Sequence, residues 1–277
     1  MTLGTVVVTG ANGQVGRQLL QSLSNCTQRI IALVRTPAPL KATTVITDWM
    51  HCELGSQAIA EADAIVHLAG SLLPARRDYQ GANLATTQVL VKALQGKKKP
   101  IVFLSYVGAS VQATNVYLST KAQVESRLAE IGAPVTVFRC THIIGTPENP
   151  GLTAQHWLSH GGKPVNVFGS GEQKLAPIYG GDVVSAIIQA LENPQAGIFD
   201  LAGPECLSLN DWVRFFNHSQ TIKINHLSPP IARLLPWVLP NLPRALVEVM
   251  LGDSIGNAQP AVKLWGLKLT PLSQIWG

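Results

Sequence analysis

Residues 5–16 read TVVVTGANGQVG, and this stretch predicts a buried strand, a glycine turn and the start of a helix. The β-branched run Thr5–Thr9 favours a strand buried on both faces. Gly10 allows a tight turn, Gly13 lets the backbone approach a ligand, and Gly16 lets the helix pack on the strand. The free N–H groups at the start of that helix attract phosphate. We therefore expect a dinucleotide pyrophosphate to bind here.

Apolar runs and helical patterns alternate outward from this stretch. Further strands are expected at 29–34, 45–47, 64–68, 101–104, 135–138 and 198–201, and helices at 14–23 and 116–131. A strand-to-helix unit is expected at 178–191, with Asp182 as the residue that caps the helix. Continuous β-branched runs separated by helices indicate a parallel sheet covered on both faces. The expected fold is α/β, a doubly wound Rossmann sheet.

The composition changes after about Pro147, where Pro and Gly become frequent and the alternation weakens. We expect residues 1–146 plus 178–203 to form the dinucleotide-binding domain. Residues 147–177 plus 204–277 are expected to form a smaller, C-terminal substrate lobe. That lobe would cover the carboxyl ends of the strands, where ligands bind in open α/β sheets.

The chain is apolar and poor in charge. Hydrophobic residues make up 46% of its 277 residues and charged residues 13%, against roughly 25% in ordinary soluble chains. Such a surface favours cover by a second subunit, a partner or a membrane face. The net charge of +5 is too small to argue for nucleic acid. No apolar run reaches the length of a membrane span, and for the apolar stretch 228–243 packing within the lobe is preferred over cleft cover or peripheral membrane contact.

The cysteines and histidines predict no metal site. Cys26, Cys52, Cys140 and Cys206 are scattered, without the spacing of a zinc site or a disulfide framework. His156 lies four residues before His160, but the nearby sequence supplies no third ligand. Reduced thiols and the absence of a basic leader before the first strand fit a cytoplasmic protein.

The end of the second strand indicates which nicotinamide cofactor binds. A carboxylate at this place takes the ribose hydroxyls of NAD, and an arginine accommodates the 2′-phosphate of NADP. The sequence here is Leu33-Val34-Arg35-Thr36, without a carboxylate. We therefore expect NADP rather than NAD, with Arg35 at the phosphate. The loop residues expected to contact the cofactor are Gly10, Asn12, Gly13, Gln14, Val15 and Gly16.

Ser105, Tyr117 and Lys121 form the candidate catalytic set. Tyr117 and Lys121 are four residues apart and share a face of the expected helix. A nearby ammonium favours the phenolate, so Lys121 would lower the Tyr117 pKa and let the tyrosine exchange protons near neutral pH. Lys121 would also hold the nicotinamide ribose, and Ser105 would polarise a carbonyl or alcohol.

With Tyr-x-x-x-Lys downstream, the TGANGQVG loop resembles that of the short-chain dehydrogenase/reductase superfamily, in its extended and atypical (epimerase/dehydratase-like) branch. The resemblance covers about residues 5–215. LSYVGAS, VYLSTKAQVE and VTVFRCTHIIG are most similar to the branch that contains the NADPH-binding accessory subunit of respiratory complex I. It implies cofactor contacts at Asp48, Trp49, Leu68, Ala69, Gly70, Cys140, Thr141 and His142.

The chain departs from the family pattern at two places. Tyr106 stands where many members have a second Ser or Thr, which leaves open which hydroxyl assists catalysis. Lys174-Leu175-Ala176 lacks the arginine usual in nucleotide-sugar enzymes. Two functions therefore remain: an NADP-dependent reductase, dehydrogenase or epimerase acting on an unidentified carbonyl or alcohol, and a non-catalytic NADPH-binding protein in structure, assembly or redox sensing.

Overall fold

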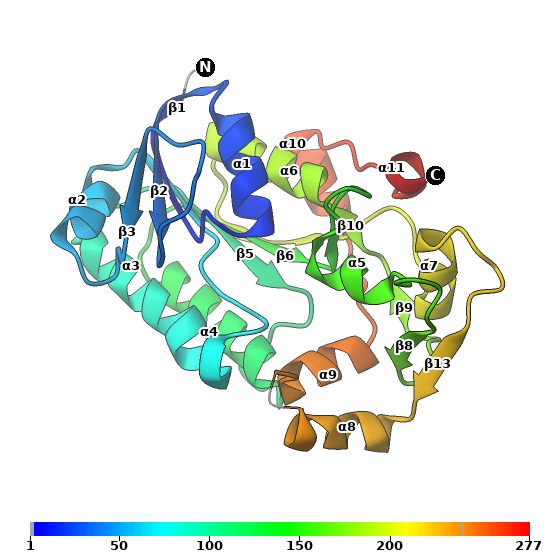
Figure 1. The fold of residues 1–277 in the computed structure, drawn as a ribbon. Coiled ribbons are helices and arrows are strands. Elements are labelled where there is room, and N and C mark those ends of the chain that lie inside the picture. Colours follow the sequence, from blue (N-terminus) through cyan, green and yellow to red (C-terminus); the bar gives the residue numbers. More distant parts are fainter. Residues whose placement is uncertain (1–2, 240) are drawn as a thin grey trace.

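The computed structural model describes residues 3–239 and 241–277, and its core is a seven-stranded parallel sheet (Figure 1). The strand order is β11-β6-β5-β4-β1-β2-β3. These strands are β1 (Leu3–Thr9), β2 (Thr27–Val34), β3 (Thr44–Thr47), β4 (Ala64–His67), β5 (Ile101–Tyr106), β6 (Val135–Cys140) and β11 (Gly197–Leu201). The order changes direction between β1 and β4, which opens a ligand crevice at their carboxyl ends. The predicted doubly wound α/β fold is confirmed.

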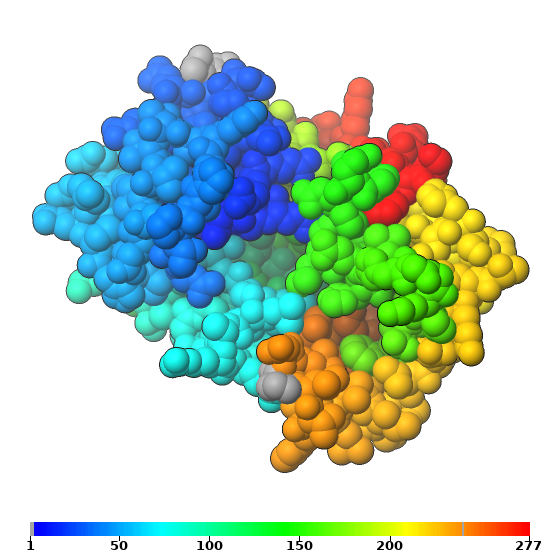
Figure 2. All heavy atoms as spheres, viewed as in Figure 1, coloured from blue at the N-terminus to red at the C-terminus, as the bar shows by residue number. Residues whose placement is uncertain are grey.

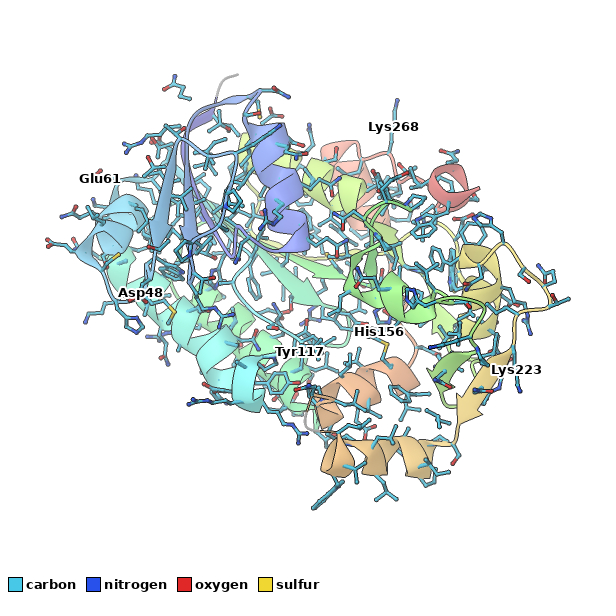
Figure 3. All side chains as sticks on the ribbon, in the orientation of Figure 1. Asp48, Glu61, Tyr117, His156, Lys223 and Lys268 are labelled. Carbon is cyan, nitrogen blue, oxygen red and sulfur yellow. The ribbon has the colours of Figure 1, made fainter. Side chains whose placement is uncertain are left out.

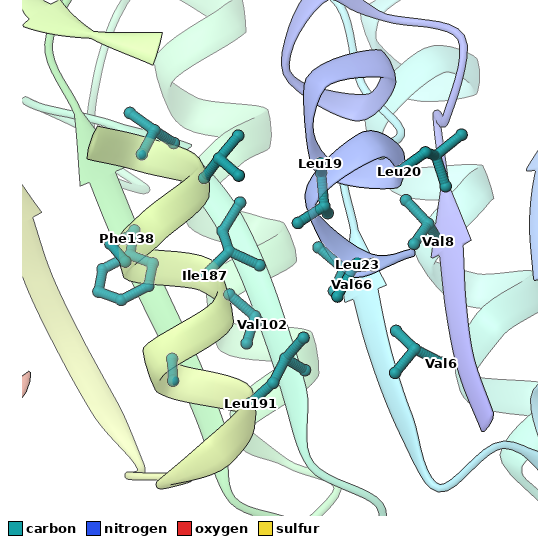
Figure 4. Packing of buried hydrophobic residues seen from close by; sticks show 14 of the residues in the cluster. Val6, Val8, Leu19, Leu20, Leu23, Val66, Val102, Phe138, Ile187 and Leu191 are labelled. Carbon is teal, nitrogen blue, oxygen red and sulfur yellow. The ribbon is translucent and has the colours of Figure 1, made fainter. Parts of the chain in front are cut away.

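Helices cover both faces of the sheet. One face carries α1 (Gln14–Leu23), α6 (Gly180–Glu192) and α10 (Gln259–Trp265), and the other carries α2 (Glu53–Glu61), α3 (Thr86–Leu94) and α4 (Val116–Ala129). The buried side of α1 repeats at helical spacing through Gly16, Leu19, Leu20 and Leu23. Figure 4 shows how the α1 leucines and Ile187 of α6 pack above the valines of the strands. This packing holds the start of α1, and therefore the glycine loop, against the end of β1.

A smaller layer of paired short strands and helices adjoins the sheet. Its strands are β7 (Ile143–Ile144) with β10 (Ile178–Tyr179), β8 (Val165–Phe168) with β13 (Ile224–Leu227), and β9 (Lys174–Leu175) with β12 (Leu207–Ser208). Its helices are α5 (Gly151–Trp157), α7 (Leu209–Phe216), α8 (Pro229–Val238), α9 (Arg244–Leu251) and α11 (Ser273–Trp276). Aromatic rings fill its core, with Phe216 against Trp157, Trp212 and Trp276. In Figure 2 the visible face is hollowed where this layer meets the blue and cyan segments.

The structure differs from the sequence prediction at two helices. Asp182 does not cap α6, which begins after Tyr179; its carboxylate instead accepts bonds from the Thr270 amide and hydroxyl at 2.6 and 2.8 Å. Trp265 of α10 packs edge-on against Phe138 and Phe199 of the large sheet, although residues 204–277 were expected in the small lobe. The division into two lobes stays a prediction.

Two short helical segments cross the end of the sheet: η1 (Ala75–Arg77), a 3-10 turn, and η2 (Gln80–Ala85), a π-helical turn. Gly81 and Ala82 of η2, together with the loop after β4, line one side of the crevice. Among residues 3–239 and 241–277, no helix is long and apolar enough to cross a membrane.

Candidate functional site

A cavity of about 160 Å³ lies over the glycine loop, at the carboxyl ends of β1, β2 and β4. It is lined by Gly10, Asn12, Gly13, Leu33, Val34, Arg35, Trp49, Met50, Leu68, Ala69, Gly70, Ser71, Gly81, Ala82 and Thr86. The lining joins the predicted phosphate loop, the end of the second strand and the loop after β4. Met50, Ser71 and the η2 residues were not predicted, because the sequence does not show that η2 folds over this edge.

The glycine loop has the geometry that a pyrophosphate needs. Gly10 has a φ of +65°, and a Cβ there would lie 2.7 Å from the amide nitrogen of Ala69. A Cβ on Gly16 would lie 2.7 Å from the carbonyl oxygen of Ala11, inside the helix packing. A Cβ on Gly13 would instead approach the Gly10 oxygen at 3.3 Å, on the side that lines the cavity. The residues present therefore fit a phosphate group above Gly13.

The first turn of α1 offers its backbone rather than its side chains. The Gln14 side chain lies against Gly145 and Gly151, and Val15 packs against the hydrophobic core between α1 and the sheet. Arg17 donates to the Asn12 carbonyl at 3.1 Å and so fixes the loop from outside. The contacts predicted for Gln14 and Val15 stay predictions, restricted to their N–H groups.

A buried polar chain supports the loop after β4. The Thr9 hydroxyl lies 2.8 Å from Nδ1 of His67, and it accepts the Ala69 amide at 3.1 Å. Nε2 of the same histidine lies 2.9 Å from the Thr87 hydroxyl. Burial lowers the pKa of His67 to about 3, so the ring is neutral and serves as a bridge. The sequence placed this histidine in an apolar strand, but it did not show its partners.

Two of the three residues predicted to contact the adenosine part of the cofactor, Arg35 and Trp49, line the cavity. Arg35 follows β2 directly, is exposed and lines the cavity, and Trp49 is almost fully buried beside it. The Asp48 carboxylate lies 2.7 Å from Nδ1 of His51 and is 68% exposed, at the edge of the molecule (Figure 3). Asp48 does not line the cavity as described, and its adenine contact stays a prediction.

Ser105 is bound into a buried ion pair. Its hydroxyl donates to Oε1 of Glu125 at 2.5 Å, and Arg139 donates to both oxygens of the same carboxylate at 3.0 and 2.6 Å. Hydrogen bonding to Glu125 raises the pKa of Arg139 above its usual range. Polarisation of a substrate by Ser105 stays a prediction, and it would require the bond to Glu125 to break. The sequence analysis did not identify Glu125, although it follows Lys121 by four residues and so shares a helix face with Lys121 and Tyr117.

Lys121 connects the cofactor cavity to a group of tyrosines. Its ammonium donates to the Leu104 carbonyl at 2.8 Å and lies 4.7 Å above the Phe103 ring. A Cβ on Gly70, which lines the cavity, would lie 3.2 Å from the same nitrogen. Burial lowers the Lys121 pKa to about 8. The ribose contact predicted for Lys121 stays a prediction.

Tyr117 is buried among aromatic and aliphatic side chains. Its ring lies edge-on to Tyr79 at 6.3 Å and to Tyr106 at 5.9 Å, and α9 covers it with Ala245 and Val249. Burial, followed by the neighbouring Tyr106, raises the Tyr117 pKa well above its usual range. The expected lowering of this pKa by Lys121 is wrong for the structure as described, because desolvation outweighs the effect of an ammonium 6.0 Å from the ring centre.

Tyr106 forms a second hydroxyl centre that the sequence only raised as a question. Its hydroxyl lies 3.0 Å from the Ser254 hydroxyl and 3.3 Å from Nε2 of His142. Burial lowers the His142 pKa to about 4, so this ring is neutral near pH 7. Ser254 lies just after α9, far along the chain, and no sequence pattern indicated it.

The other two residues predicted at this end of β6, Cys140 and Thr141, are buried in the fold. Thr141 donates to the Ala176 carbonyl at 2.6 Å, which ties the sheet to the small lobe. Burial raises the Cys140 pKa to about 12, and all four cysteines are free thiols. In residues 3–239 and 241–277, no group of three or more His, Cys, Asp and Glu side chains is arranged to hold a metal. The cofactor contacts predicted for residues 140–142 stay predictions.

Relatives with curated names support both lines of interpretation. The chain is 25% identical over 224 residues to the mitochondrial NADH dehydrogenase [ubiquinone] 1 alpha subcomplex subunit 9 of Arabidopsis thaliana, covering 74% of this chain and 55% of that protein. It therefore spans about half the length of that relative. It is 26% identical to a chloroplastic epimerase family protein of the same plant, covering 75% of this chain and 68% of the other. The relatives' names place them in organelles, and the cytoplasmic location expected here stays a prediction.

Solved structures share the fold, and a family model matches most of the chain. The UDP-glucuronic acid 4-epimerase of Bacillus cereus, solved with NAD, superposes with a TM-score of 0.75 at 18% identity, covering 98% of this chain and 95% of the other. A UDP-glucose 4-epimerase of Thermotoga maritima gives a TM-score of 0.75 at 16% identity, covering 98% and 96%. The model of the NAD dependent epimerase/dehydratase family matches residues 6–202. The chain belongs to this family, and its nicotinamide-binding Rossmann character follows from that membership.

Proposed function

We propose that the chain is an NADP-dependent oxidoreductase or epimerase of this family, with Tyr117 as its proton donor and acceptor. The observation that carries the proposal is the position of Lys121. Its ammonium reaches the cavity wall at Gly70 and lies over the Phe103 ring beside Tyr117. One cation therefore lies near both the cavity and the Tyr117 ring, 6.0 Å from the ring centre, and this supports hydride transfer coupled to proton transfer.

The preference for NADP rests on Arg35. Arg35 is the one charged residue among the described residues that line the cavity, and it follows directly after β2. A guanidinium there would bind a 2′-phosphate, and no carboxylate in the lining would repel it.

The proposed chemistry follows from the protonation states. The bound nicotinamide would supply or accept the hydride at the carbonyl or alcohol carbon of the substrate. Burial keeps Tyr117 protonated, so it would donate its proton to the carbonyl oxygen during reduction and take it back during oxidation. Lys121, with a pKa of about 8, is mostly charged at neutral pH and would stabilise the phenolate that each reduction leaves.

The second hydroxyl in this proposal belongs to Tyr106 or to Ser105. Tyr106 adjoins the Tyr117 ring, and its hydroxyl lies within hydrogen-bond distance of Ser254 and His142, whereas Ser105 donates to Glu125. We assign substrate positioning to Tyr106 and the support of α4 to Ser105. The two assignments differ in what they predict: Tyr106→Phe would raise KM or lower kcat, and Ser105→Ala would mainly lower stability.

A non-catalytic NADPH-binding role in structure or assembly is the second candidate. The 25% identical Arabidopsis relative is by its name a subunit of an NADH dehydrogenase, and this favours the alternative. Redox sensing through Cys140 gains no support, because a thiol with a pKa of about 12 is largely protonated and unreactive.

The test compares Tyr117→Phe with Lys121→Ala in two assays. Fluorescence titration measures NADPH binding, and NADPH absorbance follows turnover in a screen of carbonyl compounds. Tyr117→Phe should bind NADPH as the parent does and lose about a hundredfold to ten-thousandfold in turnover. Lys121→Ala should weaken both. Equal turnover by Tyr117→Phe would refute the assigned chemistry, and tight NADPH binding without any turnover across the screen would favour the non-catalytic role.

A further inference from the structure

Helix α8 exposes an apolar stripe at the outer edge of the small lobe, away from the central sheet (Figure 1). The exposed fractions are 52% for Ile231, 65% for Leu234, 85% for Trp237 and 72% for Val238. Spacings of three and four residues place these side chains along one side of the helix. The opposite side is buried through Ala232 and Pro236, so the orientation of α8 is fixed by packing. The chain therefore displays a rigid apolar face that its own fold leaves uncovered.

The charges around this face are mainly positive. Residues 229–247 contain Arg233 and Arg244 and no Asp or Glu. Both guanidiniums approach one carboxylate, Glu248, at 3.0 and 3.8 Å, and Arg244 remains 73% exposed. Arg233 and Arg244 share one anion, and Arg77, with Asp78 next to it, adds a third cation at the far end of the helix. This charge pattern suits a negatively charged surface.

At both ends of α8, some backbone groups are either hydrogen-bonded or absent. Helix ends carry backbone groups without partners, and these groups are costly to bury in an apolar phase. Arg77 donates to the carbonyls of Pro236 at 2.8 Å and Leu239 at 3.3 Å, at the carboxyl end. Pro229 and Pro230 begin the helix, and neither has an N–H to satisfy. Both ends of α8 therefore expose fewer unpaired backbone groups than a bare helix end would.

We propose that α8 docks on the surface of an anionic lipid bilayer, lying in the headgroup region with Trp237 as its anchor. Amphipathic interfacial helices combine an apolar face, an aromatic residue and flanking cations in this way. A second copy of the chain fits less well, because a two-fold contact along this face would bring the arginines of both copies together. The proposal does not depend on the proposed enzymatic activity.

The test is flotation of the full chain with vesicles of phosphatidylcholine, with and without phosphatidylglycerol. Binding should require phosphatidylglycerol and should decrease with salt. Trp237→Ala should lower the partition coefficient by about tenfold or more, since a large apolar side chain is lost from the buried surface. Arg244→Gln should lower it by about fivefold, the effect of one cation near an anionic surface.

Leu54, on α2, offers a matched control, because it is 64% exposed and Leu234 is 65% exposed. Leu234→Ala should weaken vesicle binding, and Leu54→Ala should leave it unchanged. NADPH titration of each variant verifies that the fold is intact. Equal effects of the two leucine variants, or no binding to anionic vesicles, would overturn the proposal. So would a parent dimer that Trp237→Ala converts to a monomer, because the face would then be a subunit interface.

Discussion

Replacement of Arg35 by alanine should reduce the affinity for NADPH and leave the affinity for NADH almost unchanged. Arg35 is exposed at the edge of the cavity, at the end of β2, so a 2′-phosphate beside it would stay in contact with water. A charge-assisted hydrogen bond contributes about 1.5–3 kcal/mol, and solvent screening favours the lower end of that range. We expect a loss of about 1.4 kcal/mol, which is about tenfold in Kd.

The assay is a fluorescence titration of each variant with NADPH and NADH at low and high salt. Arg29 provides the control, because it is also exposed on β2 but lies six residues earlier, about 20 Å away along an extended strand. Arg29→Ala should leave both affinities unchanged, and the Arg35→Ala effect should shrink as salt rises. An Arg35→Ala variant that still prefers NADPH as strongly as the parent would refute the assignment. So would a parent that binds NADH at least as tightly.

Two further predictions concern stability. Burial lowers the pKa values of His67 and His142 to about 3 and 4. Below about pH 6.5 the unfolded chain therefore takes up protons that the folded chain excludes. The free energy of unfolding should fall by about 1.4 kcal/mol per pH unit for each histidine as the pH drops toward 4. Urea unfolding measured across this pH range should show that the free energy of unfolding depends less steeply on pH in His142→Asn than in a His51→Asn control. An equal pH dependence in the two variants would contradict a buried neutral ring at His142. Glu125→Ala should lower the free energy of unfolding by about 3 kcal/mol, because Arg139 and Ser105 lose their shared partner, and a loss below about 1 kcal/mol would show that the pair is solvated.

The sequence predicted the parts of the fold whose signal is local. Strand β1 and helix α1 agree with the expected residues because a β-branched run, three glycines and a helical repeat all indicate the same elements. Helices α2 and α3 were not predicted, and Asp182 was given the wrong role. A short polar residue at the start of a helix favours a cap, but Thr270, a partner 88 residues away, binds this carboxylate instead. Long-range partners of this kind leave no periodic pattern in the sequence.

In the candidate site too, features with a local sequence pattern could be predicted and those set by long-range partners could not. Glycines and a Tyr-x-x-x-Lys pair have fixed spacings and could be found: Gly10 and Gly70 line one cavity, and the Lys121 nitrogen lies next to Gly70. The sequence could not show to which side of the sheet the hydroxyls at the end of β5 point. Adjacent strand residues point to opposite faces, so the partners of Ser105 and Tyr106 depend on which helix covers each face. Here α4 supplies Glu125 to the serine, and the segment after α9 supplies Ser254 to the tyrosine.

The buried polar groups around Tyr117 bear on the choice between an enzyme and a scaffold. Lys121 is almost fully buried and donates to the Leu104 carbonyl, and its burial lowers its pKa to about 8. An ammonium in such a place is costly for folding, and an apolar residue would stabilise the same helix packing. A scaffold that only holds the cofactor at the glycine loop would not need this group beside a buried phenol. Proton transfer next to a nicotinamide would need it, and for this reason the enzymatic proposal is preferred.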